Sequence, residues 1–551
     1  MSTPKPKNLT KITINIVKNV VAEKPTDELS LMRANRTASR KFSVAPLPKR
    51  QIAQIYDALI KKDKLKPDPK LSQLLKVRAV RTLSGVAPIT VLTKPFHCPG
   101  QCVYCPNEPG MPKSYLSNEP AAMRAKALKF DPFKQVQYRL KAMIANGHSP
   151  EKIELLVLGG TWSAYPKKYQ TWFIKRCFEG ANYLQYKNKQ IPKTKTSHTL
   201  QQAQKINEKA KYRVIGITLE TRPDWVTEAE VKNLRELGCT RVQLGAQILD
   251  DKILKFIKRG HTVEDLARAT KLLKDAAFKI DYHIMPNLPG STIAKDIKTV
   301  EKIFSDERFK PDQIKIYPTI VNEYAPLYQW YKDKIYKPYP HKKLVDLMIK
   351  LKSIVPYYCR INRLIRDIPE ESIVAGNKVT NLRQLLESEL AKRKLKCKCI
   401  RCREVYNRTL TPSPLSSLGE GSGVRLFIDK YPSSDGTEYF ISYESLKRDI
   451  LYAFVRLRIP SKNEKSAFPE LKNAGLIREL HTYGALQTLG IESQATQHKG
   501  LGKQLMTEAE KIIKKNKLSK VAVISGVGVR GYYKKIGYKL EGTYMTKKLG
   551  K

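Results

Sequence analysis

Three cysteines stand close together in the run HCPGQCVYC, at Cys98, Cys102 and Cys105. Their spacing lets three thiolates of one short loop meet one face of an iron–sulfur cube, whereas a four-iron cluster normally takes four cysteine ligands. Three ligands leave one iron open to a substrate or cofactor. The alternative is a structural zinc loop, but His97 is too close to Cys98 to complete a regular tetrahedron easily. We therefore expect these cysteines to hold a [4Fe–4S] cluster.

A second cysteine group, Cys397, Cys399 and Cys402, lies in the run KCKCIRC. Thiolates this close together repel one another unless a cation neutralises them, so we expect a second metal ion here, with Zn2+ as the candidate. Its fourth ligand stays open, and a histidine from elsewhere in the chain is one option. The chain has nine cysteines, and six of them fall in these two groups. This usage indicates metal chemistry in a reducing compartment, and we expect a cytoplasmic protein.

A glycine-rich turn, QHKGLGK from Gln497 to Lys503, precedes an amphipathic stretch over 503–515. Glycines let backbone N–H groups point into the turn, and a helix N-terminus adds partial positive charge. A pyrophosphate fits this arrangement.

Alternating strand and helix patterns between about 87 and 319 would position the first cysteine group. We expect strands at 87–94, 153–161, 213–221, 241–247, 278–286 and 312–319. Six βα units in series predict an α/β fold with a parallel sheet, closed or partly closed as a (β/α)6 barrel. Active sites of such folds lie at the carboxyl ends of the strands. The cysteine loop, the pair Gly159–Gly160 and the polar run 220–224 all follow expected strands, and together they mark a site.

The remaining chain divides by composition. The segment 181–212 is lysine-rich and long for a βα connection, so we expect a surface excursion or part of a basic groove. The run TPSPLSSLGEGSG over 411–423 has the composition of a linker. We expect four parts: a basic N-terminal region over 1–80, a barrel over 81–370, a metal-binding segment and linker over 371–423, and a last α/β domain over 424–551.

The charge of the chain is strongly one-sided. Lys and Arg total 102 against 51 Asp and Glu, which gives a net charge of +51. A polyanionic partner is the expectation, and we favour nucleic acid, because a mere compositional bias toward lysine should supply glutamates too. No apolar stretch is long enough to span a bilayer, and the N-terminus lacks the apolar segment of a signal peptide. We therefore expect no membrane partner and no secretion.

The C-terminal domain resembles the GNAT acetyltransferases. Their Q/R-x-x-G-x-G/A turn, which grips the pyrophosphate of coenzyme A, matches QHKGLGK, and VAVISGVGVRGYYKKIGYKL matches the closing half of that fold.

Over nearly its whole length the chain resembles the Elp3 family, the catalytic subunit of Elongator, in its bacterial or archaeal form with a short cysteine loop. The resemblance rests on the runs RTLSGVAPITVLTKPFHCPGQCVYCPNEPGMPKSYLSNEPAAMRA, TLETRPDW, RGHTVEDLARATKLLKDAAFKIDYHIMPNLPGST, IKIYPT, CIRCRE, IRELHTYG, QHKGLGKQLM and VISGVGVRGYYKKIGY.

The resemblance implies a tRNA-modifying enzyme with a radical SAM barrel. S-adenosyl-L-methionine (SAM) would chelate the open iron and be cleaved to a 5′-deoxyadenosyl radical, which takes a hydrogen from the acetyl methyl group of acetyl-CoA. The acetyl radical would add to C5 of uridine 34 in tRNA, and thioester hydrolysis would give 5-carboxymethyluridine. The N-terminal region would contact tRNA. The reductant stays unknown, and activity without accessory subunits is compatible with the sequence.

The resemblance also implies roles for individual residues. Candidates for SAM binding are Gly159, Gly160, Thr161, Glu220 and Gln243. Candidates for contact with coenzyme A are Gln497, Lys499, Gly500 and Gly502. Candidates for the tRNA path are Lys315, Tyr317, Arg360, Arg363 and Arg366.

Each of these assignments has an alternative. The arginines could instead form surface ion pairs. Tyr532 or Tyr533 would protonate the thiolate or position the acyl group, unless it packs in the core. Lys499 stands where the acetyltransferase motif often has arginine, and it keeps the charge but loses bidentate phosphate contacts.

Three other functions compete with this interpretation. The chain could be a protein lysine acetyltransferase with a regulatory radical SAM-like domain, but that reaction needs neither a cluster nor so basic a body. A tRNA-binding scaffold with a dead cluster site is disfavoured because all three cluster cysteines are present. A methylthiolation enzyme would leave the acetyltransferase domain unexplained.

Overall fold

The computed structural model describes residues 11–60, 62–76, 85–186, 197–405, 423–461, 466–483 and 500–550. The chain forms two compact units. The first holds the N-terminal helices together with residues 137–151, and the second holds the two β-sheets of the molecule.

The first unit is helical. Its N-terminal helices are α1 (Lys11–Ala22), α2 (Glu28–Arg40), α3 (Lys49–Ile60) and α4 (Pro69–Leu74). Asp27 caps α2 by accepting a hydrogen bond from the Ser30 N–H at 2.7 Å, and Asp68 caps α4 in the same way through the Lys70 N–H at 2.8 Å. Apolar side chains of these helices form a core of their own, which leaves their charged faces exposed.

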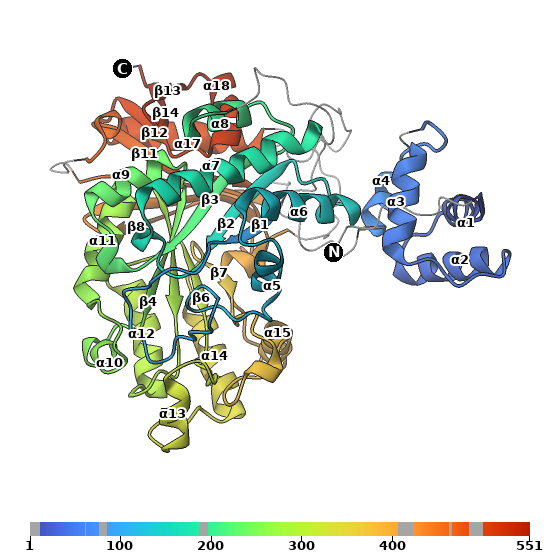
Figure 1. The fold of residues 1–551 in the computed structure, drawn as a ribbon. Helices are drawn as coiled ribbons and strands as arrows, with labels where there is room; N and C mark the ends of the chain where they lie inside the picture. The colour runs from blue at the N-terminus through green and yellow to red at the C-terminus, as the bar shows by residue number, and fades with distance from the viewer. Residues whose placement is uncertain are drawn as a thin grey trace. The chain divides into compact units, whose positions relative to one another are not determined.

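The first sheet of the second unit has seven strands in sequence order. Figure 1 shows several of them together with the helices that connect them. The strands are β1 (Ala87–Leu92), β2 (Lys152–Leu158), β3 (Arg213–Thr221), β4 (Arg241–Gln247), β5 (Lys279–Ile284), β6 (Gln313–Ile316) and β7 (Arg360–Arg363). From β2 to β7 each neighbouring pair is parallel. The expected parallel α/β sheet is confirmed, with β7 as a further strand beyond the six expected.

Helices connect these strands. They are α5 (Pro120–Ala127), α6 (Pro132–Ala145), α7 (Lys167–Tyr183), α8 (Leu200–Asn207), α9 (Glu228–Glu236), α10 (Asp251–Phe256), α11 (Val263–Asp275), α12 (Ile293–Ser305), α13 (Leu327–Lys332) and α14 (His341–Ile354). A threonine hydroxyl accepts the N–H of the helix's third residue at the start of α8, α9, α11 and α12. The lysine-rich segment 181–212 is partly helical, because it contains α8, which packs against α7. Residues 187–196 of this segment lie outside the described part.

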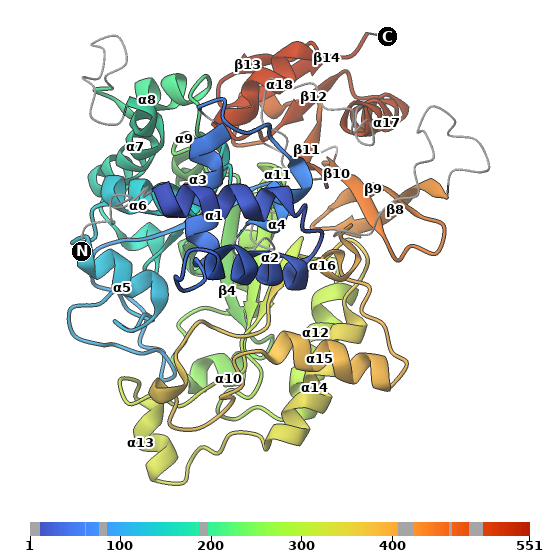
Figure 2. The same ribbon diagram turned by 90° about the vertical axis from the view of Figure 1, so that its right-hand side faces the viewer.

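The second sheet is mixed and follows the order β13-β14-β12-β11-β10-β9-β8 (Figure 2). Its strands are β8 (Val424–Ser433), β9 (Gly436–Ser445), β10 (Leu451–Ile459), β11 (Ala474–Thr482), β12 (Lys520–Val523), β13 (Lys539–Glu541) and β14 (Tyr544–Lys548). Helix α17 (Leu501–Lys515) packs on β10 and β11 through residues spaced four apart, and α18 (Arg530–Lys535) follows β12. Between the two sheets along the chain lie α15 (Leu382–Lys392) and α16 (Ile400–Arg403).

Buried ion pairs join the two sheets within the second unit. Arg458 on β10 donates to Asp275 at the end of α11 (Nε to Oδ1 2.8 Å), and Arg478 on β11 donates to Asp312 just before β6 (Nη1 to Oδ1 2.9 Å). Tyr544 adds a hydrogen bond to the Ala276 carbonyl at 2.8 Å. Asp312 and Ala276 precede β6 and β5, so the second sheet contacts the first at the amino ends of its strands.

None of the described helices is both long and apolar enough to cross a membrane.

Candidate active site

The loop with the first three cysteines leaves the carboxyl end of β1, as predicted. Its backbone is fixed on both sides of Val103, whose N–H donates to the Ile257 carbonyl (3.1 Å) and whose carbonyl accepts from the Leu327 N–H (2.8 Å). Cys102 is buried, whereas Cys98 and Cys105 are half-buried. The loop therefore presents its three thiols from a backbone held by the ends of α10 and α13.

Gly100 leaves room between two of these cysteines. A Cβ atom at this position would lie 3.6 Å from Cys102 Sγ, 3.7 Å from Cys98 Sγ and only 2.8 Å from Arg222 Nη1. A side chain would thus fill the space that the two sulfurs and the guanidinium share. Thiols of this loop next to a guanidinium, with a glycine between them, fit a negatively charged iron–sulfur cluster.

The thiols differ in their tendency to ionise. Burial raises the pKa of Cys105 to about 12. Burial would raise that of Cys102 as well, but the guanidinium of Arg259 outweighs it and lowers the pKa of Cys102. Ligation by all three would therefore release protons, because only the thiolate binds iron.

The glycine pair after β2 comes close to the cysteine loop. Gly159 and Gly160 have φ angles of +141° and +88°, which glycine adopts without strain, and a Cβ on Gly159 would collide with the Thr93 hydroxyl at the end of β1. The next residue, Thr161, places Oγ1 3.5 Å from Cys98 Sγ. The three residues predicted to bind the SAM amino group thus lie beside the expected cluster.

One face of the first sheet is polar, because β3 to β6 carry polar side chains at alternate positions. Glu220 and Gln243 are brought together by His283, whose Nδ1 lies 3.3 Å from Glu220 Oε1 and whose Nε2 lies 3.2 Å from Gln243 Oε1. Lys315 Nζ donates to the same Gln243 oxygen at 2.6 Å. Apolar neighbours such as Tyr282 point to the other face, as the two-residue period of a strand requires.

These contacts set the charges of the polar face. Burial alone would raise the pKa of Glu220, but His283 and then Lys315 outweigh it and hold the pKa at about 2. Burial, together with Lys315, lowers the pKa of His283, so the imidazole is mostly neutral at pH 7. Burial lowers the pKa of Lys315 to about 8. The face therefore presents one firm carboxylate and a lysine that loses its proton more readily than usual.

The five residues predicted for tRNA contact divide into two groups. Tyr317 lies next to this polar face, with its ring centroid 5.7 Å from that of His283. Arg366 donates to Ser114 Oγ at 3.0 Å, and the side chain of Arg363 is 46% exposed. Arg360 lies at the amino end of β7 instead, where it pairs with Glu404 and donates to Asn362 Oδ1 at 3.0 Å. The ion-pair alternative describes all three arginines, because Arg363 also pairs with Asp367 (2.5 Å) and Arg366 with Glu119 (3.2 Å).

A continuous series of hydrogen bonds crosses the polar face from the cysteine loop to the second sheet. Tyr115 donates to Glu220 (3.2 Å), and the Glu220–His283–Gln243 contacts continue to Asp281, to which Gln243 donates at 3.5 Å. Asn362 donates a hydrogen bond to Asp281 at 2.7 Å and accepts one from Arg360. Arg360 also donates to the hydroxyl of Tyr483 at 3.4 Å, and Tyr483 lies just after β11.

The glycine turn of the second sheet opens α17. Gly500 is the residue before the helix and has a φ of +118°, and a Cβ at Gly502 would lie 3.2 Å from the Tyr532 hydroxyl. β11 pairs with β12 only over Ala474–Ile477 and continues to Thr482 beyond the pairing. A Cβ at Gly502 would also lie 3.6 Å from Thr482 Cγ2, so the N-terminus of α17 lies beside the end of β11, which there pairs with β10 and not with β12. Gln497 and Lys499 lie outside the described residues.

The two candidate tyrosines differ in their surroundings. Tyr532 is 40% exposed, whereas Tyr533 is 6% exposed and belongs to the core of the second sheet. Tyr532 thus fits a role beside the glycine turn, and Tyr533 fits the core alternative.

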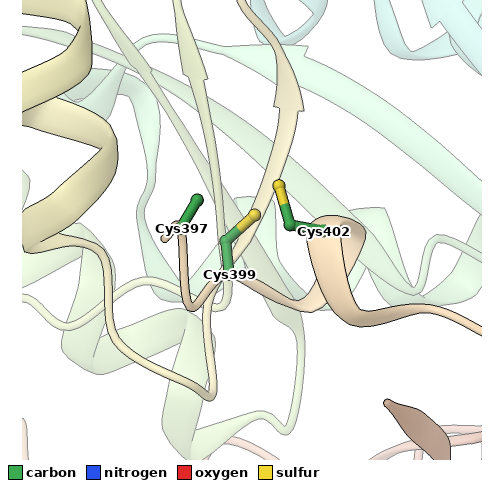
Figure 3. A group of neighbouring side chains, drawn as sticks. All are labelled: Cys397, Cys399 and Cys402. Carbon is green, nitrogen blue, oxygen red and sulfur yellow. The ribbon is translucent and has the colours of Figure 1, made fainter. Parts of the chain in front are cut away.

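The second cysteine group is compact (Figure 3). The sulfurs of Cys397, Cys399 and Cys402 all lie within 4.8 Å of one another, as three ligands of one tetrahedral ion must. Among the described residues the sulfurs of the first group are not drawn together to that extent, which suits a larger cube. A hydrogen bond from Cys397 lowers the pKa of Cys399, and Cys397 itself keeps its proton, with a raised pKa.

Several residues of the site were not singled out from the sequence. His283, Asp281 and Asn362 complete the polar face, and Arg259 flanks the cysteine loop. Arg222, which also lies beside this loop, belongs to the polar run 220–224 that the sequence did indicate. The alternation in KIDYHI could have indicated His283 and Asp281. Nothing local places Arg259 beside a cysteine 157 residues earlier.

Known protein families match the two halves of the second unit. Sequence models match residues 95–303 (Radical SAM superfamily), 311–392 (Radical_SAM C-terminal domain) and 437–548 (Acetyltransferase (GNAT) domain).

Curated relatives match along most of the chain. The tRNA uridine(34) acetyltransferase of Methanocaldococcus infernus is 42% identical over 492 residues, which is 87% of this chain and 88% of the relative. Elongator complex protein 3 of Homo sapiens is 34% identical over 559 residues, covering 99% and 98%. A solved structure, the archaeal Methanocaldococcus infernus Elp3 with an N-terminal deletion (1–46), has a TM-score of 0.70 at 39% identity and covers 85% of this chain and all of that one.

Proposed function

This chain belongs to the Elp3 family of tRNA uridine(34) acetyltransferases, and on that premise we propose that it forms 5-carboxymethyluridine at the wobble uridine of tRNA from SAM and acetyl-CoA. Two features support the proposal: a three-cysteine loop at the carboxyl end of β1 and a glycine turn at the start of α17.

The residues around the cysteine loop fit the cofactors of a radical SAM enzyme. Cys98, Cys102 and Cys105 would hold a [4Fe–4S] cluster, and Gly159 to Thr161 would take the amino group of SAM. When bound, the cluster and SAM supply a 5′-deoxyadenosyl radical by one-electron cleavage. The ionised Glu220 can accept hydrogen bonds from ribose hydroxyls, and Gln243 keeps its imidazole partner oriented.

The start of α17 would bind coenzyme A. The backbone N–H groups of the first helical turn are free of intrahelical partners, and the helix dipole favours a pyrophosphate there. The Tyr532 hydroxyl lies close enough to Gly502 to donate a hydrogen bond to a group bound at the turn. Gln497 and Lys499 remain candidates on the basis of sequence.

One observation supports a single reaction that uses both the cysteine loop and the coenzyme A turn: a hydrogen-bonded polar face extends from that loop toward the second sheet. It begins at Tyr115 in the cysteine loop and ends at Tyr483, which directly follows β11. Charged and amide side chains in a sheet interior are costly unless they serve a polar ligand or one another. A polar sheet face of this kind suits a reaction that uses both the cluster and the acetyl donor.

The basic residues would hold tRNA. Arg363, Arg366, Lys315 and Tyr317 lie around the carboxyl ends of β6 and β7, where an unstacked base has ring and cation partners. In the first unit, Arg33, Arg36 and Arg40 share one exposed face of α2 at helical spacing and would contact phosphates. We also propose that the chain works in the cytoplasm and without other subunits.

The second cysteine group would hold a zinc ion with a structural role. Arg403 next to it donates to Glu444 on β9 (2.6 Å) and to the Tyr357 carbonyl (2.6 Å), so this segment links the second sheet to the connection between α14 and β7. About one equivalent of zinc in the purified protein, lost in Cys399→Ser, would support the assignment; a metal-free protein of unchanged stability would refute it.

The function is tested with anaerobically reconstituted protein given SAM, dithionite, acetyl-CoA and bulk tRNA. We expect 5′-deoxyadenosine and 5-carboxymethyluridine, detected by mass spectrometry of the digested tRNA, and the loss of both in Cys102→Ala. Cys177→Ala is the matched control, because Cys177 is buried on α7 outside the cysteine loop. Acetyl-lysine on a protein substrate, with no modified uridine, would favour the lysine acetyltransferase instead.

A further inference from the structure

Arg259 is a buried cation in direct contact with one of the cluster cysteines. Arg259 is only 7% exposed, and its Nη1 lies 3.6 Å from Cys102 Sγ. Nη2 donates to the Gly245 carbonyl at 2.8 Å. The guanidinium is thus fixed by the backbone of β4 and aimed at a sulfur.

The group nearest to Arg259 that can carry a compensating negative charge is the sulfur of Cys102. Across the described ranges no carboxylate lies within ion-pair distance of Arg259, and its Nε has no hydrogen-bond partner. The neighbouring Arg222 differs, because Asp224 neutralises it through two hydrogen bonds of 3.0 and 2.8 Å. An unpaired buried cation costs several kcal/mol. Asp224 acts on Arg259 only from beyond ion-pair distance, so Cys102 and the anionic group that it binds lie closest and supply most of the compensating negative charge.

The local backbone is adapted to this guanidinium. A Cβ at Gly245 would collide with Arg259 Nη2, so the guanidinium can take this position only with glycine at 245. Two residues later Gln247 has a φ of +66°, and the pairing of β4 with β5 shifts register between Leu244 and Gln247. The glycine and the register shift at the end of β4 make room for the guanidinium, which indicates that its position beside Cys102 serves a function.

We propose that Arg259 sets the reduction potential of the cluster by stabilising its reduced form. This inference rests on the [4Fe–4S] cluster of the proposed function. Reduction adds one electron from an external one-electron donor, dithionite in the test, and breaks no bond, so the cluster and its thiolates gain one negative charge. A fixed cation that also donates N–H···S favours the more negative state, and it therefore raises the potential.

The test is a redox titration of the reconstituted full-length protein without SAM, in which electron paramagnetic resonance counts the reduced cluster. For Arg259→Gln we expect at least a tenfold lower ratio of reduced to oxidised cluster at a given potential, which is a midpoint lower by about 59 mV for one electron. Arg259→Lys keeps the charge and should recover part of the shift. Gly245→Ala should lower the midpoint without removing any charge, because its methyl group displaces the guanidinium from Cys102.

Arg235→Gln is the control for the loss of a buried arginine. Arg235 is 1% exposed and donates to the carbonyls of Cys239, Ser525 and Thr543, away from the cysteine loop. The reduction midpoint of the cluster in Arg235→Gln should match that of the wild type.

The outcomes separate the two proposals. Arg259→Gln with wild-type iron and sulfide content and an unchanged midpoint would overturn the role of Arg259. If Arg259→Gln binds no cluster, unchanged midpoints in both Arg259→Lys and Gly245→Ala would overturn it. A wild-type protein that assembles no four-iron cluster would instead contradict the proposed function.

Discussion

Tyr532 and Tyr533 are neighbours on α18, yet only the hydroxyl of Tyr532 lies against the glycine turn of α17. We expect Tyr532→Phe to weaken acetyl-CoA binding about three- to tenfold, which is the usual worth of one hydrogen bond. Tyr533→Phe, the matched control in the core, should leave affinity unchanged. Isothermal titration with acetyl-CoA measures both; equal losses in the two variants would contradict the assignment.

Glu220 makes the stability of the protein sensitive to acid. Its pKa is about 2 in the folded chain against the ordinary value of 4.5, since the effects of His283 and Lys315 exceed that of burial. Its stabilising contribution is therefore complete above pH 4.5 and is lost as the pH falls toward 2.

Glu220→Gln should reduce the slope of unfolding free energy against pH in this window by up to one proton, about 1.4 kcal/mol per pH unit. Urea unfolding at several pH values measures the slope. An unchanged slope would show that Glu220 is not held ionised by its neighbours.

At the scale of elements, the docking of the second sheet on the first depends on buried ion pairs. Arg458 is fully buried, and Asp275→Asn removes the carboxylate that its Nε contacts at 2.8 Å. Leaving this guanidinium under-compensated should lower the free energy of unfolding by about 3 kcal/mol.

Asp435→Asn is the matched control, because that carboxylate is 66% exposed and lies 3.5 Å from Lys271. It should cost less than about 1 kcal/mol. Urea unfolding of both variants provides the comparison, and equal effects would mean that the buried pair contributes no more than a surface pair.

The strands show which elements a sequence can reveal. Those near 153–161 and 213–221 are apolar runs with a β-branched content that suits a buried sheet, and both are present. β7 was not expected, because its four residues, RINR, carry no apolar pattern and become a strand only through pairing with β6. The cysteine groups and the glycine turn could be singled out because their residues are close together in the sequence, whereas the contact of Arg259 with Cys102 depends on the tertiary fold.

At the scale of the whole molecule, the net charge of +51 is distributed over both units, and α2 in the first unit carries Arg33, Arg36 and Arg40 on one exposed face. Replacing these three arginines with glutamine should weaken tRNA binding and flatten the plot of log affinity against log salt by about two to three units.

The control replaces Lys514, Lys515 and Lys517, exposed at the end of α17, and changes the net charge by the same amount. If both triple variants flatten the plot equally, the effect is one of overall charge, and α2 is not a specific contact.

The proposed function requires that the cluster of this chain activates the acetyl donor that its acetyltransferase domain binds. Acetyl-CoA deuterated in its methyl group tests this most directly, with mass spectrometry of both 5′-deoxyadenosine and the digested tRNA after an anaerobic turnover with SAM. We predict one deuterium in 5′-deoxyadenosine and two in the carboxymethyl group of the modified uridine. Unlabelled 5′-deoxyadenosine formed alongside a labelled nucleoside would contradict hydrogen abstraction from the acetyl group.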